Sequence, residues 1–264
     1  MKRNEVSFFR DFSEKAPEID YFSLAFQEFG EFFELSLYGP GERTRGKSGT
    51  SEKAYRAFSE DFQGKTLLVP RQVHGKEILL PSGKNSPEGD GIFLEDSSWR
   101  GMLRFADCCP VILFSSEPHP WMLLLHMGFR GALEGIPSAG WRLIRKRFPS
   151  LPPERCRAFL GPAVRGCCYS RKMEDPFTLR GMQLFPEGLW ELRKDMCFFD
   201  LPRMGAHLLA REGMKNEHML LLEECVCCGP SKWYSYRRGD EEDRNVLLGG
   251  IRKCTISGEH ERKK

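Results

Sequence analysis

Residues 91–131 read GIFLEDSSWRGMLRFADCCPVILFSSEPHPWMLLLHMGFRG, a series of short apolar runs separated by Gly, Pro and charged residues. Because helices in globular proteins usually need roughly ten residues or more, runs this short are typical of strands. Two similar runs precede this stretch. In chain order, the six predicted strands are 66–70, 76–80, 91–94, 101–105, 111–114 and 121–125.

Longer patterns with the periodicity of a helix follow at 132–148, at about 187–196 and at 204–212. Strand runs therefore come in clusters with helices between them. This order predicts a mixed α/β (α+β) fold, with a mixed sheet or a pair of sheets flanked by helices. The polar, glycine-containing segment 39–49 is predicted to be a long loop, and the charged tail 257–264 is predicted to be frayed.

The chain has 264 residues, of which 40% are hydrophobic and 29% charged, which is typical of one large globular domain or two small ones. The formal net charge of +3 is too small to indicate a nucleic-acid partner. The N-terminus is charged every few residues, and there is no apolar stretch of about 18 residues. We therefore expect a cytoplasmic protein without a membrane segment.

The ten cysteines are expected to be free thiols, because the chain shows no export signal. Three pairs are adjacent in the chain, at 108–109, 167–168 and 227–228, and neighbouring cysteines bridge each other only with backbone strain. Cys225 and Cys228 form a CxxC motif. A structural zinc site usually has a second such pair, however, so core packing is their expected role.

Three reactive residues stand close to the ends of predicted strands. His74 follows the run 66–70, while Cys108 and His126 come directly after 101–105 and 121–125. Two imidazoles and a thiolate suit zinc, and three protein ligands leave a fourth position for water or substrate. The spacing matches no zinc finger, so hydrogen-bonded histidines and an inert cysteine are the alternative interpretation.

Arginines accompany these residues. The turn GFRG at 128–131 precedes a helical pattern, so backbone N–H groups and the guanidinium of Arg130 could contact a phosphate there. A solvated Arg130 is the alternative. The segment WYSYRRG at 233–239 sets aromatic rings beside Arg237 and Arg238, an arrangement that can hold a flat base and a phosphate or can simply pack.

Together these segments resemble the laccase-domain family, which is named after polyphenol oxidases and is also described as zinc-dependent purine nucleoside phosphorylases. The resemblance covers roughly residues 66–255, whereas the first 60 residues match weakly. The motifs, in chain order, are QVHG at 72–75, DG at 90–91, ADCCP at 106–110, HMGFRG at 126–131, GPAVRGCCY at 161–169 and YSYRR at 234–238.

This resemblance implies a single laccase-like domain over 1–264, with a layered α/β/β/α, cysteine-hydrolase-like fold of mixed sheets. It implies phosphorolysis of adenosine, inosine and methylthioadenosine, with deamination of adenosine as a second activity. The expected partners are therefore a small nucleoside and phosphate.

The resemblance also assigns residues. It implies that the catalytic metal ligands are His74, Cys108 and His126, with zinc as the metal and copper possible. Asp107 or a backbone carbonyl is expected to orient an imidazole. The residues expected to bind substrate or phosphate are Gln72, Asp107, Arg130 and Arg237.

The sequence also departs from the family pattern. Ser170 and Arg171 follow Tyr169 where the family usually has an acidic residue, and Gly239 stands where an Asp is typical. The segment 199–209 lacks the Trp and Asn that are common there. We therefore predict an intact metal site with an altered substrate pocket.

Other functions fit the same residues. Cys108 as a nucleophile with a histidine base would make an amidase or deamidase, for example one that edits peptidoglycan precursors. Copper-dependent oxidation of phenols is disfavoured, because multicopper oxidation needs about ten His-rich ligands and the chain has six histidines. In a non-enzymatic binding protein, a fourth ligand such as Cys109 or Cys167 would close the zinc site.

Overall fold

The computed structural model describes residues 9–11, 21–26, 33–59, 65–81, 88–229 and 233–252. The predicted loop 39–49 lies within these ranges and forms a series of turns and bends, whereas the tail 257–264 lies outside them. In the part that is described, no helix is both long enough and apolar enough to span a bilayer.

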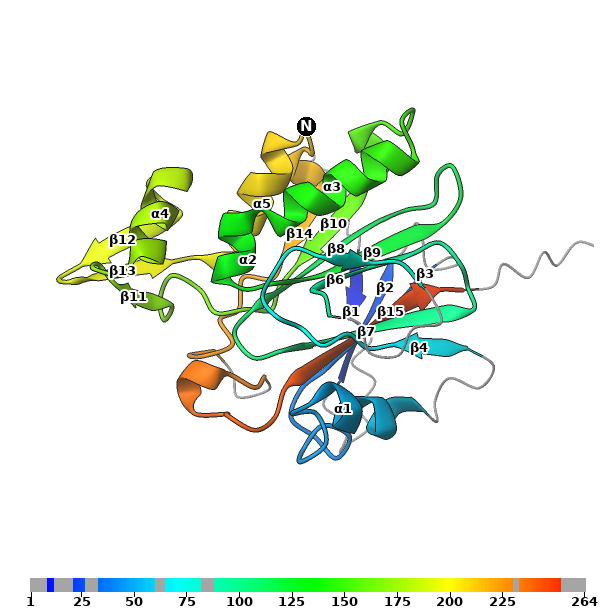
Figure 1. The fold of residues 1–264 in the computed structure, drawn as a ribbon, viewed down its shortest axis with the longest axis horizontal. Helices are drawn as coiled ribbons and strands as arrows, with labels where there is room; N and C mark the ends of the chain where they lie inside the picture. The colour runs from blue at the N-terminus through cyan, green and yellow to red at the C-terminus, as the bar shows by residue number, and fades with distance from the viewer. Residues whose placement is uncertain are drawn as a thin grey trace, which may run out of the picture.

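Two six-stranded mixed sheets form the centre of the fold (Figure 1). The first sheet has the order β1 (Phe9–Asp11), β2 (Tyr21–Phe26), β3 (Phe33–Tyr38), β15 (Asn245–Ile251), β7 (Trp99–Phe105) and β4 (Thr66–Leu68). Its neighbouring strands are antiparallel except for β7 and β4.

The second sheet has the order β14 (Met219–Leu221), β10 (Arg157–Leu160), β8 (Cys109–Ser115), β9 (Trp121–Met127), β6 (Gly91–Leu94) and β5 (Ile78–Leu79). Its two outer pairs are parallel, and its central pairs are antiparallel. All six predicted strand runs are confirmed as β4 to β9. The mixed sheets are confirmed as well.

The main core lies between the two sheets, and every residue of β8, β9 and β15 is buried. Two glycines allow the sheets to approach each other. A Cβ on Gly101 in β7 would lie 2.7 Å from the side chain of Leu124 in β9, and one on Gly249 in β15 would lie 2.9 Å from it. A larger residue at either position would therefore push the sheets apart.

Helices cover the outer faces of both sheets (Figure 1). The second sheet is covered by α2 (Phe129–Glu134), α3 (Ile136–Arg147) and α5 (Leu201–Arg211). On the first sheet, α1 (Ser51–Phe58) packs Ala54 and Phe58 against Met102 and Val246. The predicted arrangement of sheets flanked by helices is thus confirmed, and so is the helix predicted at 204–212.

The prediction of one helix over 132–148 is wrong in part. The segment contains two helices, α2 and α3, which are separated at Gly135. Gly135 has a φ of 74°, in the left-handed region that ends a helix. Helix α2 therefore ends at Glu134, and α3 begins anew at Ile136.

The prediction of a helix at 187–196 is wrong. Two strands form there, β12 (Trp190–Arg193) and β13 (Met196–Phe199), and they join β11 (Ser170–Lys172) in a small antiparallel sheet. Lys194 makes the turn between β12 and β13 with a φ of 57°, and burial alternates along β13. Beside this sheet lies α4 (Pro176–Leu184), at the left of Figure 1. Among the described residues, short 3₁₀ turns form at η2 (Pro153–Arg155), η3 (Asn216–His218) and η4 (Tyr236–Arg238).

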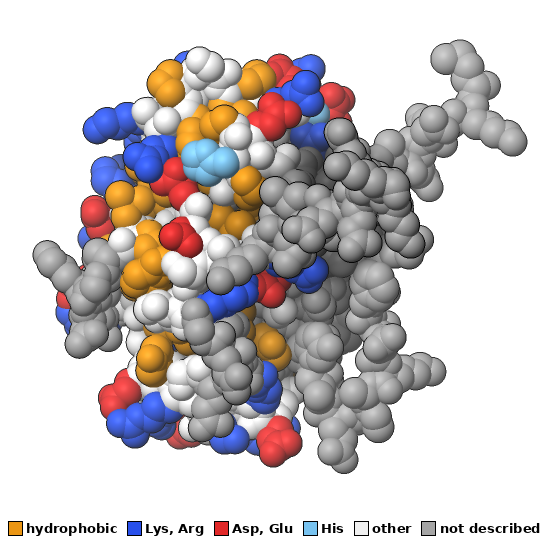
Figure 2. Space-filling model, turned by 90° about the vertical axis from the view of Figure 1, so that its right-hand side faces the viewer, with side chains coloured by type: hydrophobic (Ala, Val, Ile, Leu, Met, Phe, Trp, Pro, Cys, Tyr) orange, Lys and Arg blue, Asp and Glu red, His pale blue; other side chains and the backbone are white. Residues whose placement is uncertain are grey.

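Charged side chains of both signs are mixed on the face shown in Figure 2. Basic and acidic groups there alternate with apolar ones, and neither sign gathers into a patch among the coloured side chains. This distribution agrees with the small net charge of +3.

Candidate metal centre

The three predicted ligands come together at one end of the second sheet. Cys108 directly precedes β8, and Pro110 in β8 pairs with His126 in β9, so the thiol and the imidazole lie at the same strand ends. His74 comes from the loop between β4 and β5. The Cys108 sulfur and one ring nitrogen from each of the two histidines all lie within 4.8 Å of one another.

Asp90 holds both histidines in place. Its fully buried carboxylate lies 2.7 Å from Nδ1 of His126 and accepts the backbone N–H of His74 at 3.0 Å. The same carboxylate accepts the N–H groups of Val73 at 3.1 Å and Gly75 at 2.8 Å. Because Nδ1 of His126 is engaged by Asp90, Nε2 is the nitrogen left to bind a ligand.

The role of orienting an imidazole, predicted for Asp107, belongs to Asp90 at His126. Asp107 instead has a φ of 81°, and its carboxylate accepts the hydroxyl of Ser235 at 2.6 Å and the backbone N–H of Arg237 at 2.9 Å. These contacts fix the turn that carries Cys108. They also attach the C-terminal segment to the site.

Gly128 leaves the space in which the ligands meet. A Cβ at this position would lie 2.9 Å from Cδ2 of His74 and 3.1 Å from the sulfur of Cys108. Any side chain there would displace at least one ligand. The sequence shows Gly128 in the motif HMGFRG, but only the structure reveals what the missing side chain makes room for.

The charges of the three groups depend on one another. Burial would raise the pKa of the Cys108 thiol, but the charge of His126 and hydrogen bonds with His126 and His74 outweigh it and lower the pKa to about 6. Burial would lower the pKa of His126, but Cys108 and Asp90 raise it to about 9. In the metal-free protein, these pKa values favour a thiolate beside an imidazolium near neutral pH.

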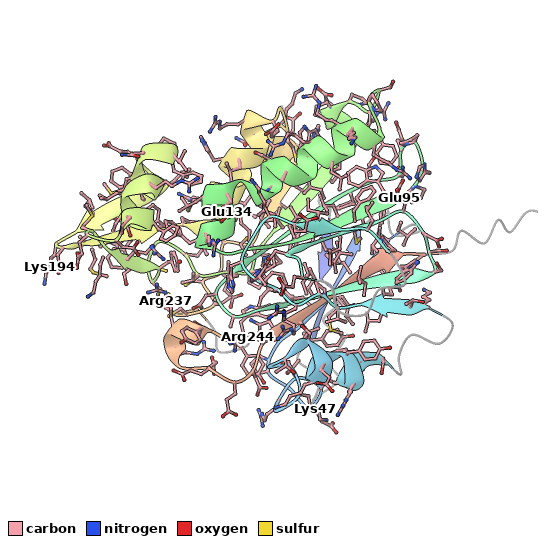
Figure 3. The ribbon with its side chains drawn as sticks, in the orientation of Figure 1. Lys47, Glu95, Glu134, Lys194, Arg237 and Arg244 are labelled. Atoms are coloured by element: carbon pink, nitrogen blue, oxygen red, sulfur yellow. The ribbon has the colours of Figure 1, made fainter. Side chains whose placement is uncertain are left out.

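The group faces a cleft of about 1180 Å³. Its walls come from the ends of both sheets, from the turn before β11 and from the C-terminal segment around η4. The cleft is rich in guanidinium groups, and Figure 3 shows two of them, Arg237 and Arg244, on the segment that leads into β15. The arginines that line the cleft are Arg104, Arg130, Arg171, Arg237 and Arg244.

The predicted binding residues all line this cleft, but they differ in what they contact. Gln72 pairs its side-chain amide with both backbone groups of Arg104 at 2.9 Å, which ties the His74 loop to β7. Arg130 is largely exposed and pairs with Glu134 at 2.8 Å. Arg237 donates to the carbonyl oxygen of Ser170 at 2.8 Å.

No fourth ligand closes the group within the described parts of the chain. His74, Cys108 and His126 form a set of three, without Cys109 or Cys167. The thiol of Cys109 is buried and donates to the carbonyl oxygen of Pro110 at 3.3 Å. A three-ligand group that faces a cleft is the arrangement of a catalytic metal site rather than a closed structural one.

Residues 44–250 match the family described as multi-copper polyphenol oxidoreductase laccase. The chain belongs to this family. The resemblance seen in the sequence motifs is thereby confirmed. This laccase family implies a metal, and two imidazoles with one thiolate are a donor set that fits zinc or copper.

Relatives within the family carry a different name. A purine nucleoside phosphorylase of Aquifex aeolicus is 31% identical over 189 residues, which are 69% of this chain and 82% of that protein. The purine nucleoside phosphorylase YlmD of Geobacillus stearothermophilus is 28% identical over 181 residues, which are 63% of this chain and 65% of that protein.

Two solved structures share the fold of this chain. YlmD from Geobacillus stearothermophilus has a TM-score of 0.77 at 20% identity, over 93% of this chain and 99% of that one. The YfiH protein of Bacillus licheniformis has a TM-score of 0.75 at 18% identity, over 93% of this chain and 100% of that one.

Proposed function

We propose that this member of the laccase family is a zinc-dependent purine nucleoside phosphorylase. It would convert adenosine, inosine or methylthioadenosine and phosphate into the free base and the sugar 1-phosphate, and it would also deaminate adenosine. The observation that carries the proposal is the open group of His74, Cys108 and His126 at a cleft lined by arginines, in a chain with relatives named purine nucleoside phosphorylase.

His74, Cys108 and His126 would hold the zinc through two ring nitrogens and one sulfur. When bound, zinc supplies a Lewis acid that can polarise an oxygen of phosphate or of water. Asp90 keeps His126 in the orientation that ligation needs. Burial would raise the pKa of Asp90, but the contacts with His126 and the backbone N–H groups of Gly75 and Val73 lower it, so the carboxylate stays charged at neutral pH.

Arg237 is the side chain best suited to receive phosphate. Its guanidinium hydrogen-bonds to Ser170 and lies 4.4 Å from the ring centre of Tyr169. Among the described residues no carboxylate pairs with this guanidinium, whereas Arg130 has Glu134 and Arg171 has Asp175. Arg237 would therefore fix the phosphate, with Arg130 as a second, weaker cation.

Aromatic side chains in the cleft would hold the purine. Tyr236 is 56% exposed and lines the cleft, so its ring is available for stacking on a flat base. Burial raises the pKa of Tyr169, so its phenol stays protonated and can donate a hydrogen bond.

The same groups would assist cleavage of the glycosidic bond. As the bond to the base breaks, positive charge develops on the sugar. A phosphate held by Arg237 on the neighbouring side would stabilise that charge. These residues would thus bind the phosphate and the nucleoside, orient them towards each other and compensate the charge that develops on the sugar. Phosphorolysis requires all three tasks.

The test is release of free base from inosine and adenosine, with and without phosphate, combined with metal analysis of the purified protein by mass spectrometry. We expect phosphate-dependent base release and zinc in the protein. Cys108→Ala and His126→Ala should each lower activity by more than about 100-fold. Mutation of a residue that only hydrogen-bonds to a metal ligand already costs about 10–100-fold in metal affinity or activity. Cys109→Ala is the matched control, since its thiol is outside the group of three ligands and donates to the carbonyl oxygen of Pro110. Full activity in either ligand variant would refute the assignment.

A thiol amidase or deamidase is the second candidate. The lowered pKa of Cys108 and the imidazolium of His126 favour it, because a thiolate beside a histidine is the nucleophile of such enzymes. This candidate is also the one that a relation to cysteine hydrolases would suggest.

Chelation separates the two candidates. A zinc phosphorylase should lose activity on removal of the metal and regain it when zinc is restored. A thiol enzyme should keep its activity after chelation and lose it after alkylation of Cys108. Recovery with copper but not with zinc would assign the site to copper instead.

A further inference from the structure

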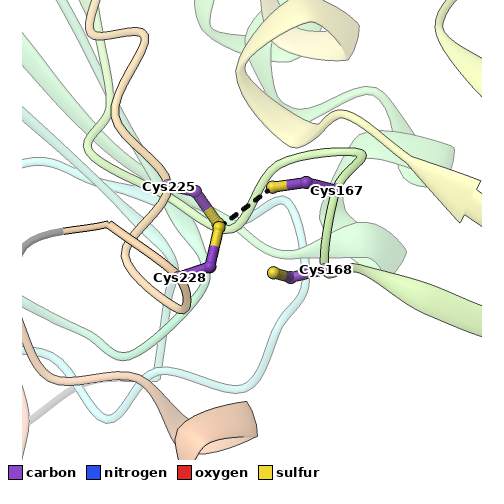
Figure 4. A group of neighbouring side chains, drawn as sticks. All are labelled: Cys167, Cys168, Cys225 and Cys228. Carbon is purple, nitrogen blue, oxygen red and sulfur yellow. Dashed lines mark hydrogen bonds between the residues drawn. The ribbon is translucent and has the colours of Figure 1, made fainter.

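A second group of four cysteines lies apart from the ligands of the candidate centre. Cys167 and Cys168 come from the turn before β11, and Cys225 and Cys228 come from the loop after β14. Figure 4 shows their four side chains converging from these two loops. The expected role of Cys225 and Cys228 in core packing is thus wrong for Cys228, which is exposed.

The distances suit a tetrahedral set of sulfurs. All four Sγ atoms lie within 4.8 Å of one another, and those of Cys167 and Cys228 are 3.4 Å apart. Four thiolates at 2.3 Å from a zinc ion would lie about 3.8 Å apart. Small side-chain rotations would therefore bring the four sulfurs to bonding distance around one ion.

The backbone of the CxxC segment is shaped to present sulfur to a cation. The N–H of Gly229 closes the turn on the carbonyl oxygen of Cys225 at 2.8 Å, where a Cβ on Gly229 would lie 2.5 Å from the same oxygen. The turn thus places the side chains of Cys225 and Cys228 on the same side as Cys167 and Cys168.

The two loops are also joined by their backbones. Ala163 and Cys225 form an isolated parallel bridge, and Val226 donates to the carbonyl oxygen of Ala163 at 3.2 Å. The thiol pairs are thus held opposite each other by the fold. All four are free cysteines in the structure.

We propose that Cys167, Cys168, Cys225 and Cys228 bind one zinc ion as a structural site, separate from the site of His74, Cys108 and His126. A closed set of four thiolates leaves no position for substrate. The ion would tie the turn that leads to Tyr169 to the loop that precedes η4. Since both segments form walls of the cleft, the site would keep the cleft in shape.

Metal content in two backgrounds tests the proposal. We expect about two zinc ions per chain in the wild type, about one in His126→Ala, about one in Cys228→Ser, and almost none when both changes are combined. Cys227→Ser is the matched control, because Cys227 is adjacent in sequence but outside the group of four, and it should keep the zinc content of the wild type. The proposal is wrong if Cys228→Ser leaves the zinc content unchanged both in the wild type and in His126→Ala.

The design separates this site from the proposed catalytic zinc. If only the catalytic assignment is wrong, the wild type should hold about one zinc, and Cys228→Ser should still lose it. If only the four-cysteine site is wrong, His126→Ala should lose all zinc, while Cys228→Ser loses none.

Alkylation of the wild-type protein gives a test that does not depend on a variant folding. Cys167 and Cys228 are exposed, so an alkylating reagent should reach both after chelation and label them above neutral pH. Adding zinc back should protect them, as shown by mass spectrometry of the peptides. Equal labelling with and without zinc, or a Cys167–Cys228 disulfide in the zinc-loaded protein, would overturn the proposal.

Discussion

Gly128 shows how one missing side chain creates the site. A methyl group there would lie 2.9 Å from His74 and 3.1 Å from the sulfur of Cys108. We predict that Gly128→Ala lowers metal affinity by about 10–100-fold, because the ligands must separate to admit the methyl group. Competition with a coloured chelator measures this affinity. Gly75→Ala is the control in the same loop as His74, since its Cβ would make ordinary contacts at 3.7 Å; equal affinity in the two variants would contradict the prediction.

The reactivity of Cys108 in metal-free protein should follow its lowered pKa. Because the pKa is about 6 instead of the usual 9.0, the thiolate predominates above pH 6 and alkylation should slow only below it. In His126→Ala the midpoint should move to higher pH, since the charge and hydrogen bond of His126 lower this pKa. Cys109 serves as an internal control, because burial raises the pKa of its thiol and should keep it unreactive. A midpoint unchanged by His126→Ala would count against the thiolate–imidazolium pair.

At the scale of elements, the break between α2 and α3 depends on Gly135. Its φ of 74° is left-handed, and an alanine there would be strained even though the nearest atom to its Cβ is 3.9 Å away. We predict that Gly135→Ala lowers the free energy of unfolding by about 1–2 kcal/mol, measured by urea denaturation. Ser138→Ala, in the first turn of α3, should change it by less than about 0.5 kcal/mol. If Gly135→Ala were as stable as the wild type, the left-handed residue between α2 and α3 would not be needed for stability.

The elements also show where local pattern misleads. The segment 187–196 contains apolar residues at helical spacing, yet it forms β12 and part of β13. Residues 170–172 supply the strand that pairs with β13, and the left-handed Lys194 makes the turn. Pairing with a distant strand thus outweighed a local helical pattern.

At the scale of the whole molecule, Arg100 joins three strands of the first sheet. It is buried in β7, forms an ion pair with Glu34 in β3 and donates to the carbonyl oxygen of Ile251 in β15 at 2.8 Å. Burial, with the nearby charge of Arg252, lowers the pKa of Arg100 to about 10, so it remains charged at neutral pH.

We predict that Arg100→Met lowers the free energy of unfolding by about 1–3 kcal/mol, because it removes charged hydrogen bonds from a buried position. Arg56→Met is the control. Arg56 also pairs with a glutamate, Glu52, but both side chains are about three-quarters exposed, so a change below about 0.5 kcal/mol is expected. Urea denaturation of both variants provides the comparison, and equal losses would argue against a role for the buried guanidinium of Arg100.

The sequence by itself determined the strands of residues 66–125 and the residues His74, Cys108 and His126, because short apolar runs and the motifs at their ends are local signals. The sequence motifs also indicated the family to which the chain belongs. It did not assign Asp90 as the group that orients His126, or Gly128 as the space between the ligands. Those roles depend on the register of β8 and β9 and on the loop that carries His74.

Only the tertiary structure brought the four cysteines together, because 61 positions of sequence separate Cys167 from Cys228. The CxxC segment shows one half of such a group, and the adjacent pair 167–168 does not resemble a second half in the sequence. The bridge between Ala163 and Cys225 places the halves side by side. Contacts of this kind arise from the packing of distant segments, which the local spacing of residues does not encode.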